Sequence, residues 1–144
     1  MAWREEISHP ALGAPEIATG IFRSTPGGRL IREQRTPREE TASIGERFIS
    51  RDTGEEVELL PITEDLAPFV ATLRAMMAGG VGQLSERFTL ALSTSSEGWR
   101  VALTPPDGEA ARALAILGCG ERVRGLEIGG PGGEVRRILI GPAR

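Results

Sequence analysis

The sequence predicts a mainly β fold in which one amphipathic helix covers an antiparallel sheet. Residues 61–80 carry apolar side chains at helical spacing. Strand-like segments lie on both sides of this stretch, and turn signals recur at a spacing of roughly 8–12 residues, which is typical of all-β sheets and barrels. The chain has 144 residues, enough for one domain with a real core and not comfortably enough for two. We therefore expect residues 1–144 to form a single domain.

The helix is predicted from a stripe of six apolar residues: Leu66, Phe69, Val70, Leu73, Met76 and Met77. Gly79 and Gly80 follow the stripe, where a left-handed helix stop is expected. With Asp65 as the N-cap, Pro68 falls at the third helical position, where its missing N–H is not needed. Because no other segment before or after it could cover the stripe, the helix should lie against the sheet.

Short strands are expected before the helix at 3–7, 17–23, 29–35, 40–44, 47–51 and 56–60. Turns at 25–28 and 51–54 separate some of them. The clearest strand signals follow the helix. Phe88, Leu90 and Leu92 alternate with other residues, and Trp99, Val101 and Leu103 repeat the alternation after a turn at 97–98. This pattern predicts an antiparallel hairpin with one buried face.

Three later segments complete the expected elements. The alanine content of 109–117 favours a helix slightly, whereas its length and the glycine that follows suit a strand. Segments 122–128 and 134–140 are expected to be strands. The glycine-rich stretch 129–133 between them leads into a strand, so it is a hairpin loop and not a phosphate-binding loop, which requires a helix start.

Composition narrows the classes of function. The net charge of −3 gives no electrostatic case for nucleic acid binding. The sequence has no apolar run of membrane-spanning length. The first residues do not form a secretory signal, and this alone would indicate a cytosolic protein. A sequence from which the signal had been removed would look the same. All seventeen basic residues are arginine, which indicates a GC-rich genome rather than a function.

The residues that carry chemistry are isolated from one another. His9 is the only histidine and lies beside Pro10 without a nucleophile motif, so we expect no catalytic role. Cys119 is the only cysteine, and we interpret it as a small half-buried filler. Acidic pairs such as Glu39 and Glu40 point to opposite sides of a strand and are expected to be solvated. We predict no enzyme activity, no cofactor and no metal.

The helix stripe allows two interpretations. It is either plain core or a lid over an apolar cavity. Met76 and Met77 favour the lid to some extent, because methionine side chains adapt to variable acyl chains.

The ordered motifs resemble those of the LolA-type outer-membrane lipoprotein carriers. Gly20-Ile21-Phe22, then 26–30, then Pro37 are similar to the early signature of that family. Segment 43–51 matches the strands that follow, and 61–80 matches the central helix. Phe88 and 99–105 are similar to a later pattern of phenylalanine, tryptophan and proline, and the last two strands match in spacing. The resemblance covers nearly all of the chain.

The resemblance implies an open, curved antiparallel half-barrel with helices at its mouth, and it makes 109–117 a strand. It implies a non-enzymatic periplasmic carrier or chaperone for lipid or lipoprotein acyl chains in outer-membrane biogenesis, with membrane-bound donor and acceptor proteins as partners. The residues expected to line the apolar cavity are Leu66, Phe69, Val70, Leu73, Met76, Met77, Phe22, Leu30, Phe88 and Trp99.

Two features depart from the family pattern. The signal peptide and first helix that precede the first strand are not found here, so we expect the sequence to be truncated at its N-terminus. An arginine that ties the lid in the family stands just before the first proline, and here that position is Thr25. Because of this difference, a lipid other than a lipoprotein is an equally good candidate for the cargo. The alternative function is a non-catalytic β-sheet module of the cell envelope that binds a partner strand at an open edge.

Overall fold

The computed structural model describes residues 1–11, 13–64, 66–78, 81–104, 113–130 and 132–141. It contains eleven strands, one α-helix and one 3-10 helix. The first six strands are β1 (Ala2–Ser8), β2 (Glu16–Ser24), β3 (Leu30–Thr36), β4 (Glu40–Ile44), β5 (Phe48–Asp52) and β6 (Val57–Pro61). The helices α1 (Ala67–Ala78) and η1 (Val81–Glu86) follow. The last five strands are β7 (Thr89–Ser95), β8 (Gly98–Thr104), β9 (Leu114–Cys119), β10 (Arg122–Gly129) and β11 (Val135–Ile140).

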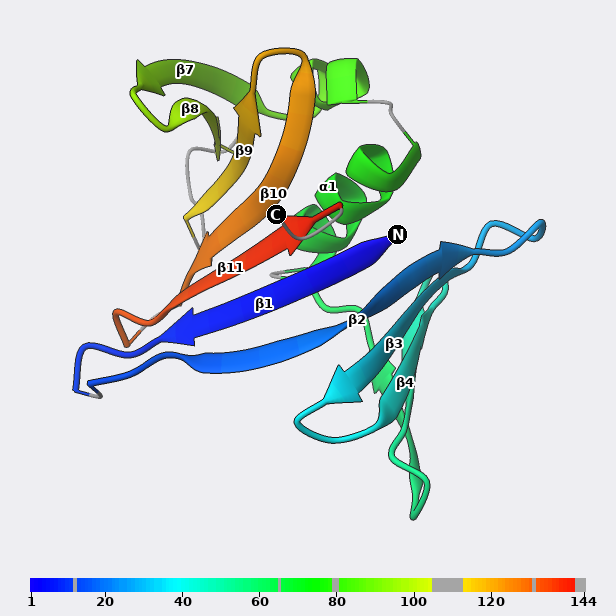
Figure 1. The fold of residues 1–144 in the computed structure, drawn as a ribbon. Coiled ribbons are helices and arrows are strands. Elements are labelled where there is room, and N and C mark those ends of the chain that lie inside the picture. Colours follow the sequence, from blue (N-terminus) through cyan, green and yellow to red (C-terminus); the bar gives the residue numbers. More distant parts are fainter. Residues whose placement is uncertain (12, 65, 79–80, 105–112, 131, 142–144) are drawn as a thin grey trace.

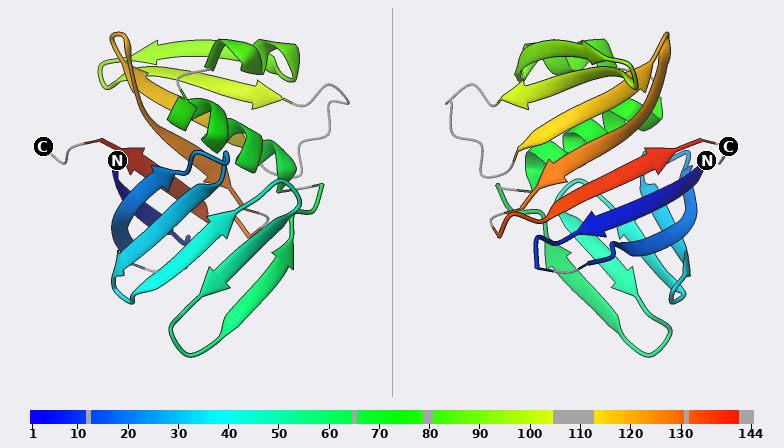
Figure 2. Two further views of the ribbon diagram at one scale, coloured as in Figure 1. Left: turned by 90° about the vertical axis from the view of Figure 1, so that its right-hand side faces the viewer. Right: turned by 60° about the vertical axis from the view of Figure 1, so that its left-hand side comes forward.

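All eleven strands form one antiparallel sheet in the order β6-β5-β4-β3-β2-β1-β11-β10-β9-β8-β7. The first and last strands pair at its centre, where Trp3 lies opposite Ile140 and Ser8 opposite Val135. The two edge strands of the sheet are β6 and β7. No other strand lies between them in the sequence, and α1 and η1 connect them. The sheet is strongly curved and open, with α1 against its concave side (Figures 1 and 2). The predicted half-barrel class is confirmed.

The helix begins close to where the sequence placed it. The N–H of Ala67, the first residue of α1, donates to the carbonyl of Thr63 in the connection after β6, at 2.9 Å. Pro68 is the second helical residue, one position earlier than predicted, and at that position its N–H is still not required. The proposed cap, Asp65, lies outside the described residues. Thr72 is fully buried, and its hydroxyl donates to the carbonyl of Pro68 at 2.8 Å.

The apolar stripe of α1 faces the sheet, as predicted. We call the sheet face that it contacts the inner face and the opposite one the outer face. Two buried clusters share the helix. The first cluster joins Met76 to η1 and β8–β10 through Leu84, Phe88, Leu103, Leu114, Ile116, Leu126 and Ile128. The second cluster joins Val70 and Leu73 to β1–β4 and β11 through Trp3, Phe22, Leu30, Ile44 and Ile138.

Two tryptophans lie flat across glycines of the neighbouring strand on the inner face. Trp3 pairs with Gly20, and a Cβ added to Gly20 would lie 2.6 Å from the indole ring. Trp99 pairs with Gly118, where an added Cβ would lie 1.9 Å from the ring. Real Cβ atoms do not approach so closely, so these glycines are required for the two rings to pack. The physical role of Gly20, part of the early family signature, is thereby explained.

The hairpin predicted at 87–103 is correct in pairing and wrong in burial. Leu90 lies opposite Leu103 and Leu92 opposite Val101, so these residues share the inner face as expected. Phe88 is not part of the strand, because its N–H bonds to the carbonyl of Leu84 at the end of η1, a 3-10 helix that the sequence did not predict. All of β7 is exposed, because it is the edge of the sheet.

Three smaller expectations need correction or completion. Cys119 is exposed and not half-buried. Glu40 is not simply solvated, because its carboxylate accepts hydrogen bonds from Arg51 at 2.9 and 3.3 Å. Within the ambiguous segment 109–117, residues 114–117 belong to strand β9, as the family resemblance implied and against helix propensity. Its packing inside the first cluster overrides the preference of its alanines.

Candidate functional site

Nine of the ten residues expected to line an acyl-chain cavity belong to the two apolar clusters of the inner side or pack against them, and the tenth is Leu66. Six of them are buried: Phe22, Leu30, Val70, Leu73, Met76 and Phe88. The other four are half-buried: Leu66, Phe69, Met77 and Trp99. The set is divided between the two clusters, and Phe69 packs against both. With α1 in this position, the six buried side chains are covered by protein contacts.

A small cavity does lie beside the beginning of α1. It has a volume of about 270 Å³, and Leu66 and Phe69 contribute to its wall from the helix side. The remaining lining is mixed, formed by Ile7, His9, Glu16, Ile128, Gly130, Glu134 and Arg136. Pockets that hold drug-sized ligands usually measure about 300–1,000 Å³. This space is therefore slightly smaller than that range.

Arg74 ties α1 to two connections at the rim of the sheet. Its guanidinium donates to the carbonyl of Gly28 at 2.7 Å, in the connection from β2 to β3. It also donates to the carbonyls of Ile44 at 2.9 Å and Gly45 at 2.6 Å, where β4 turns into β5. Hydrogen bonds from a charged group are among the stronger ones in proteins. These three bonds hold the middle of α1 over one side of the sheet. We call this side, formed by β1–β5, the β1–β5 wing, and the other side the β8–β10 wing.

Thr25, which stands where the family has its lid arginine, has a local role. Its N–H donates to the carbonyl of Arg29 at 2.9 Å, and its hydroxyl accepts from the N–H of Arg29 at 3.1 Å. These bonds shape the turn that presents the Gly28 carbonyl to Arg74. The arginine that holds helix to rim is thus on the helix in this chain and not on the loop.

Sequence reasoning missed Arg74, although one signal was present. Arg74 is the only charged residue in α1. A single charge within an otherwise apolar helix needs partners or solvent. The sequence does not show which of these applies, because Gly28 and Ile44 lie 46 and 30 positions away.

A cluster of ion pairs occupies the inner face on β1, β3, β4, β5 and β11. Glu5 is buried and lies 3.5 Å from the guanidinium of Arg32 and 3.9 Å from that of Arg136. Arg32 also stacks on the Trp3 ring, 4.0 Å from its centroid. Burial lowers the pKa of Arg32, while the nearby carboxylates of Glu5 and Glu40 act in the opposite direction. This side of the inner face therefore carries paired charges beside the apolar second cluster, whereas the inner face of β8–β10 contributes the apolar side chains of the first cluster.

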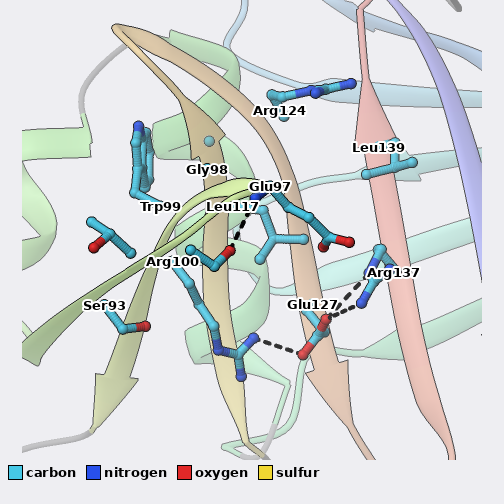
Figure 3. A pocket seen from close by; sticks show the side chains of 13 residues that line it. Ser93, Glu97, Gly98, Trp99, Arg100, Leu117, Arg124, Glu127, Arg137 and Leu139 are labelled. Carbon is cyan, nitrogen blue, oxygen red and sulfur yellow. Dashed lines mark hydrogen bonds and ion pairs between the residues drawn. The ribbon is translucent and has the colours of Figure 1, made fainter.

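The outer face carries a second cavity, of about 630 Å³, beneath the tip of the β7–β8 hairpin (Figure 3). Leu117 and Leu139 contribute apolar surface to it. Glu127 accepts from Arg100 at 2.7 Å and from Arg137 at 2.9 Å, so both its oxygens are engaged. The lining contains neither histidine nor cysteine. These groups form an ion-pair network across three strands.

Glu127 makes stability depend on pH. Burial raises the pKa of its carboxyl, but hydrogen bonds from Arg137 and Arg100 outweigh burial, and the net pKa is lowered. A carboxyl whose pKa is lower in the folded state stabilises the fold above its unfolded pKa, and this contribution is lost as the pH falls through the folded value. We expect Glu127→Gln to melt at a lower temperature than the wild type at pH 7. The gap should close on acidification, and a gap that stays constant with pH would contradict the assignment.

Among the described residues, none of the helices is long and apolar enough to cross a membrane. No group of three or more potential metal ligands occurs in the part of the chain that the structure describes.

Comparison with known families identifies this arrangement. The family described as outer membrane lipoprotein carrier protein LolA-like matches residues 6–144. The chain belongs to the LolA-like family. A search of curated proteins found no match. In this LolA-like protein, α1 packs on the inner face of the open half-barrel through the two apolar clusters.

Proposed function

We propose that this LolA-like protein is a non-enzymatic periplasmic carrier that binds the acyl chains of a lipid or lipoprotein between α1 and the inner face. Family membership supports a role in carrying lipoproteins or lipids in general. The specific proposal rests on the way in which α1 is attached to the sheet. It covers an apolar sheet face with its stripe, and three hydrogen bonds from one side chain hold it to the rim.

The two wings of the inner face differ in how well they suit a hydrocarbon guest. The β8–β10 wing presents Leu103, Leu114 and Ile116 around Met76. The β1–β5 wing presents the apolar Phe22, Leu30 and Ile44 around Val70 and Leu73 of α1. It also carries the paired charges of Glu5 and Arg32, and covering such charges with hydrocarbon is unfavourable. We infer that acyl chains enter between α1 and the two apolar clusters of the inner face, and that Arg74 holds the helix closed over them. Residues 1–144 would act as one carrier unit.

The proposal is tested by native mass spectrometry of the purified protein and by titration with a fluorescent fatty acid. Co-purified lipid and saturable probe binding are expected. Absence of both would favour the edge-binding module, for which the exposed Leu90 and Leu92 on edge strand β7 provide a specific observation.

Met77→Glu is expected to weaken probe binding, because it places a carboxylate next to the proposed hydrocarbon path. Met77 is half-buried and packs against the second cluster, so the probe must compete with a new charge there. Leu59→Glu on strand β6 adds the same charge at an exposed position away from α1 and serves as the control. Equal affinity of the Met77 and Leu59 variants for the probe would place the acyl chains elsewhere.

A further inference from the structure

We propose that two copies of this chain pair through strand β7, in an antiparallel, two-fold symmetric extension of the sheet. β7 is the last strand of the sheet on that side, and all seven of its residues are exposed. Among the described residues, only β8 pairs with it. Its outer backbone edge is therefore free to hydrogen-bond with another strand.

The composition of β7 contrasts with that of the opposite edge. Its sequence, TLALSTS, contains no charge, no proline and no glycine. Edge strands of natural proteins are usually protected from pairing by charges, prolines or bulges. The other edge, β6, carries Glu58 and Pro61, and Glu55 and Glu56 directly precede it. One edge is thus protected against strand addition and the other is not.

The sequence of β7 is complementary to itself in antiparallel orientation. With Ala91 on the two-fold axis, Leu90 lies opposite the partner's Leu92, and Thr89 lies opposite the partner's Ser93. Like pairs therefore face each other along the strand: aliphatic with aliphatic, and hydroxyl with hydroxyl. A one-residue shift of this register would move each leucine to the other face of the partner strand.

The nearest charges on either side of β7 favour the same orientation. Arg87 precedes the strand and Glu97 follows it. Antiparallel pairing brings the end of one copy that carries Arg87 towards the end of the other that carries Glu97. Parallel pairing would place the two Glu97 carboxylates side by side, whereas at the other end Glu86 stands beside Arg87. Charge complementarity thus selects the antiparallel, two-fold arrangement.

Pairing also covers apolar surface that the monomer leaves open. Leu90 and Leu92 are 41% and 68% exposed on the inner face, beside buried Leu103. In the dimer, the leucines of both copies adjoin, and the two apolar inner faces meet across the axis. Because the contact uses the same strand on both copies, it closes at two subunits and does not propagate.

The first test is sedimentation velocity on the full chain, from low micromolar to about 1 mM. The wild type is expected to pass from monomer to dimer as the concentration rises. Leu92→Lys should remain monomeric, because a charged lysine on an edge strand opposes pairing. Leu59→Lys is the matched control, since Leu59 is 65% exposed on the other edge strand, and it should dimerise like the wild type.

The second test places a cysteine on the proposed axis. In a Cys119→Ser background, Ala91→Cys should form a disulfide-linked dimer on mild oxidation, because residues opposite one another in antiparallel strands are within disulfide reach. Val57→Cys, also an exposed position on an edge strand, should cross-link much more slowly. Circular dichroism of each variant checks that the fold is retained.

Three outcomes would overturn the proposal. The first is a wild type that stays monomeric over the whole concentration range. The second is equal cross-linking of the two cysteine variants. The third is a monomeric wild type whose binding of the fluorescent fatty acid is lost in Leu92→Lys, which would assign the exposed leucines to the cargo. Fatty-acid binding by the wild type is measured separately, so failure of the dimer leaves the carrier function open to its own test.

Discussion

Leu73→Ala is expected to lower the free energy of unfolding by about 2–5 kcal/mol. Leu73 is 1% exposed, at the centre of α1, and packs in the cluster that joins the helix to β1–β4 and β11. Truncation removes buried hydrocarbon and leaves a cavity that the surrounding strands fill only in part. Urea denaturation followed by circular dichroism measures the loss.

Leu59→Ala provides the comparison for this prediction. The same atoms are removed at an exposed position of β6, and the change in stability should stay within about 0.5 kcal/mol. If Leu73→Ala loses less than about 1 kcal/mol, α1 does not pack tightly on the sheet, contrary to its burial. The comparison assumes two-state unfolding, which coincident transitions by fluorescence and circular dichroism would establish.

Arg74→Leu is expected to increase the apparent affinity for a fluorescent fatty acid by about tenfold or more. The variant loses the hydrogen bonds to the carbonyls of Gly28, Ile44 and Gly45. A charge-assisted hydrogen bond contributes about 1.5–3 kcal/mol, and about 1.4 kcal/mol corresponds to a factor of ten in an equilibrium. Loosening α1 raises the population of the open form, and the apparent dissociation constant falls in proportion.

The same variant should lose thermal stability, so affinity and melting temperature must be measured together. Arg122→Leu is the control, because Arg122 lies exposed on β10, away from α1. A lower melting temperature with unchanged affinity would mean that Arg74 only stabilises the fold and that α1 does not act as a lid. This prediction rests on the carrier function, and probe binding by the wild type is its precondition.

Local patterns predicted most of the secondary structure. The stripe from Leu66 to Met77 identified α1 and the face that it buries, because 3.6-residue periodicity depends only on helix geometry. The alternation of Leu90, Leu92, Val101 and Leu103 predicted both strands of the β7–β8 hairpin and the face that these residues share, because side chains alternate between the two faces of a strand. The ordered resemblance to the LolA-like family corrected the helix propensity of the segment that became β9.

The sequence by itself therefore determined the fold class, the covering helix and the family. Only the tertiary structure decided which apolar residues are sealed and which are open: Leu73 is buried and Leu92 is not, although both belong to clear periodic patterns. It also decided that Arg74, and not Thr25, holds the helix to the rim, and that Glu5 and Arg32 pair on the inner face. The reason is physical. Periodicity records which face a side chain shares with its neighbours, whereas burial and pairing depend on strands far apart in the chain that the curvature of the sheet brings together.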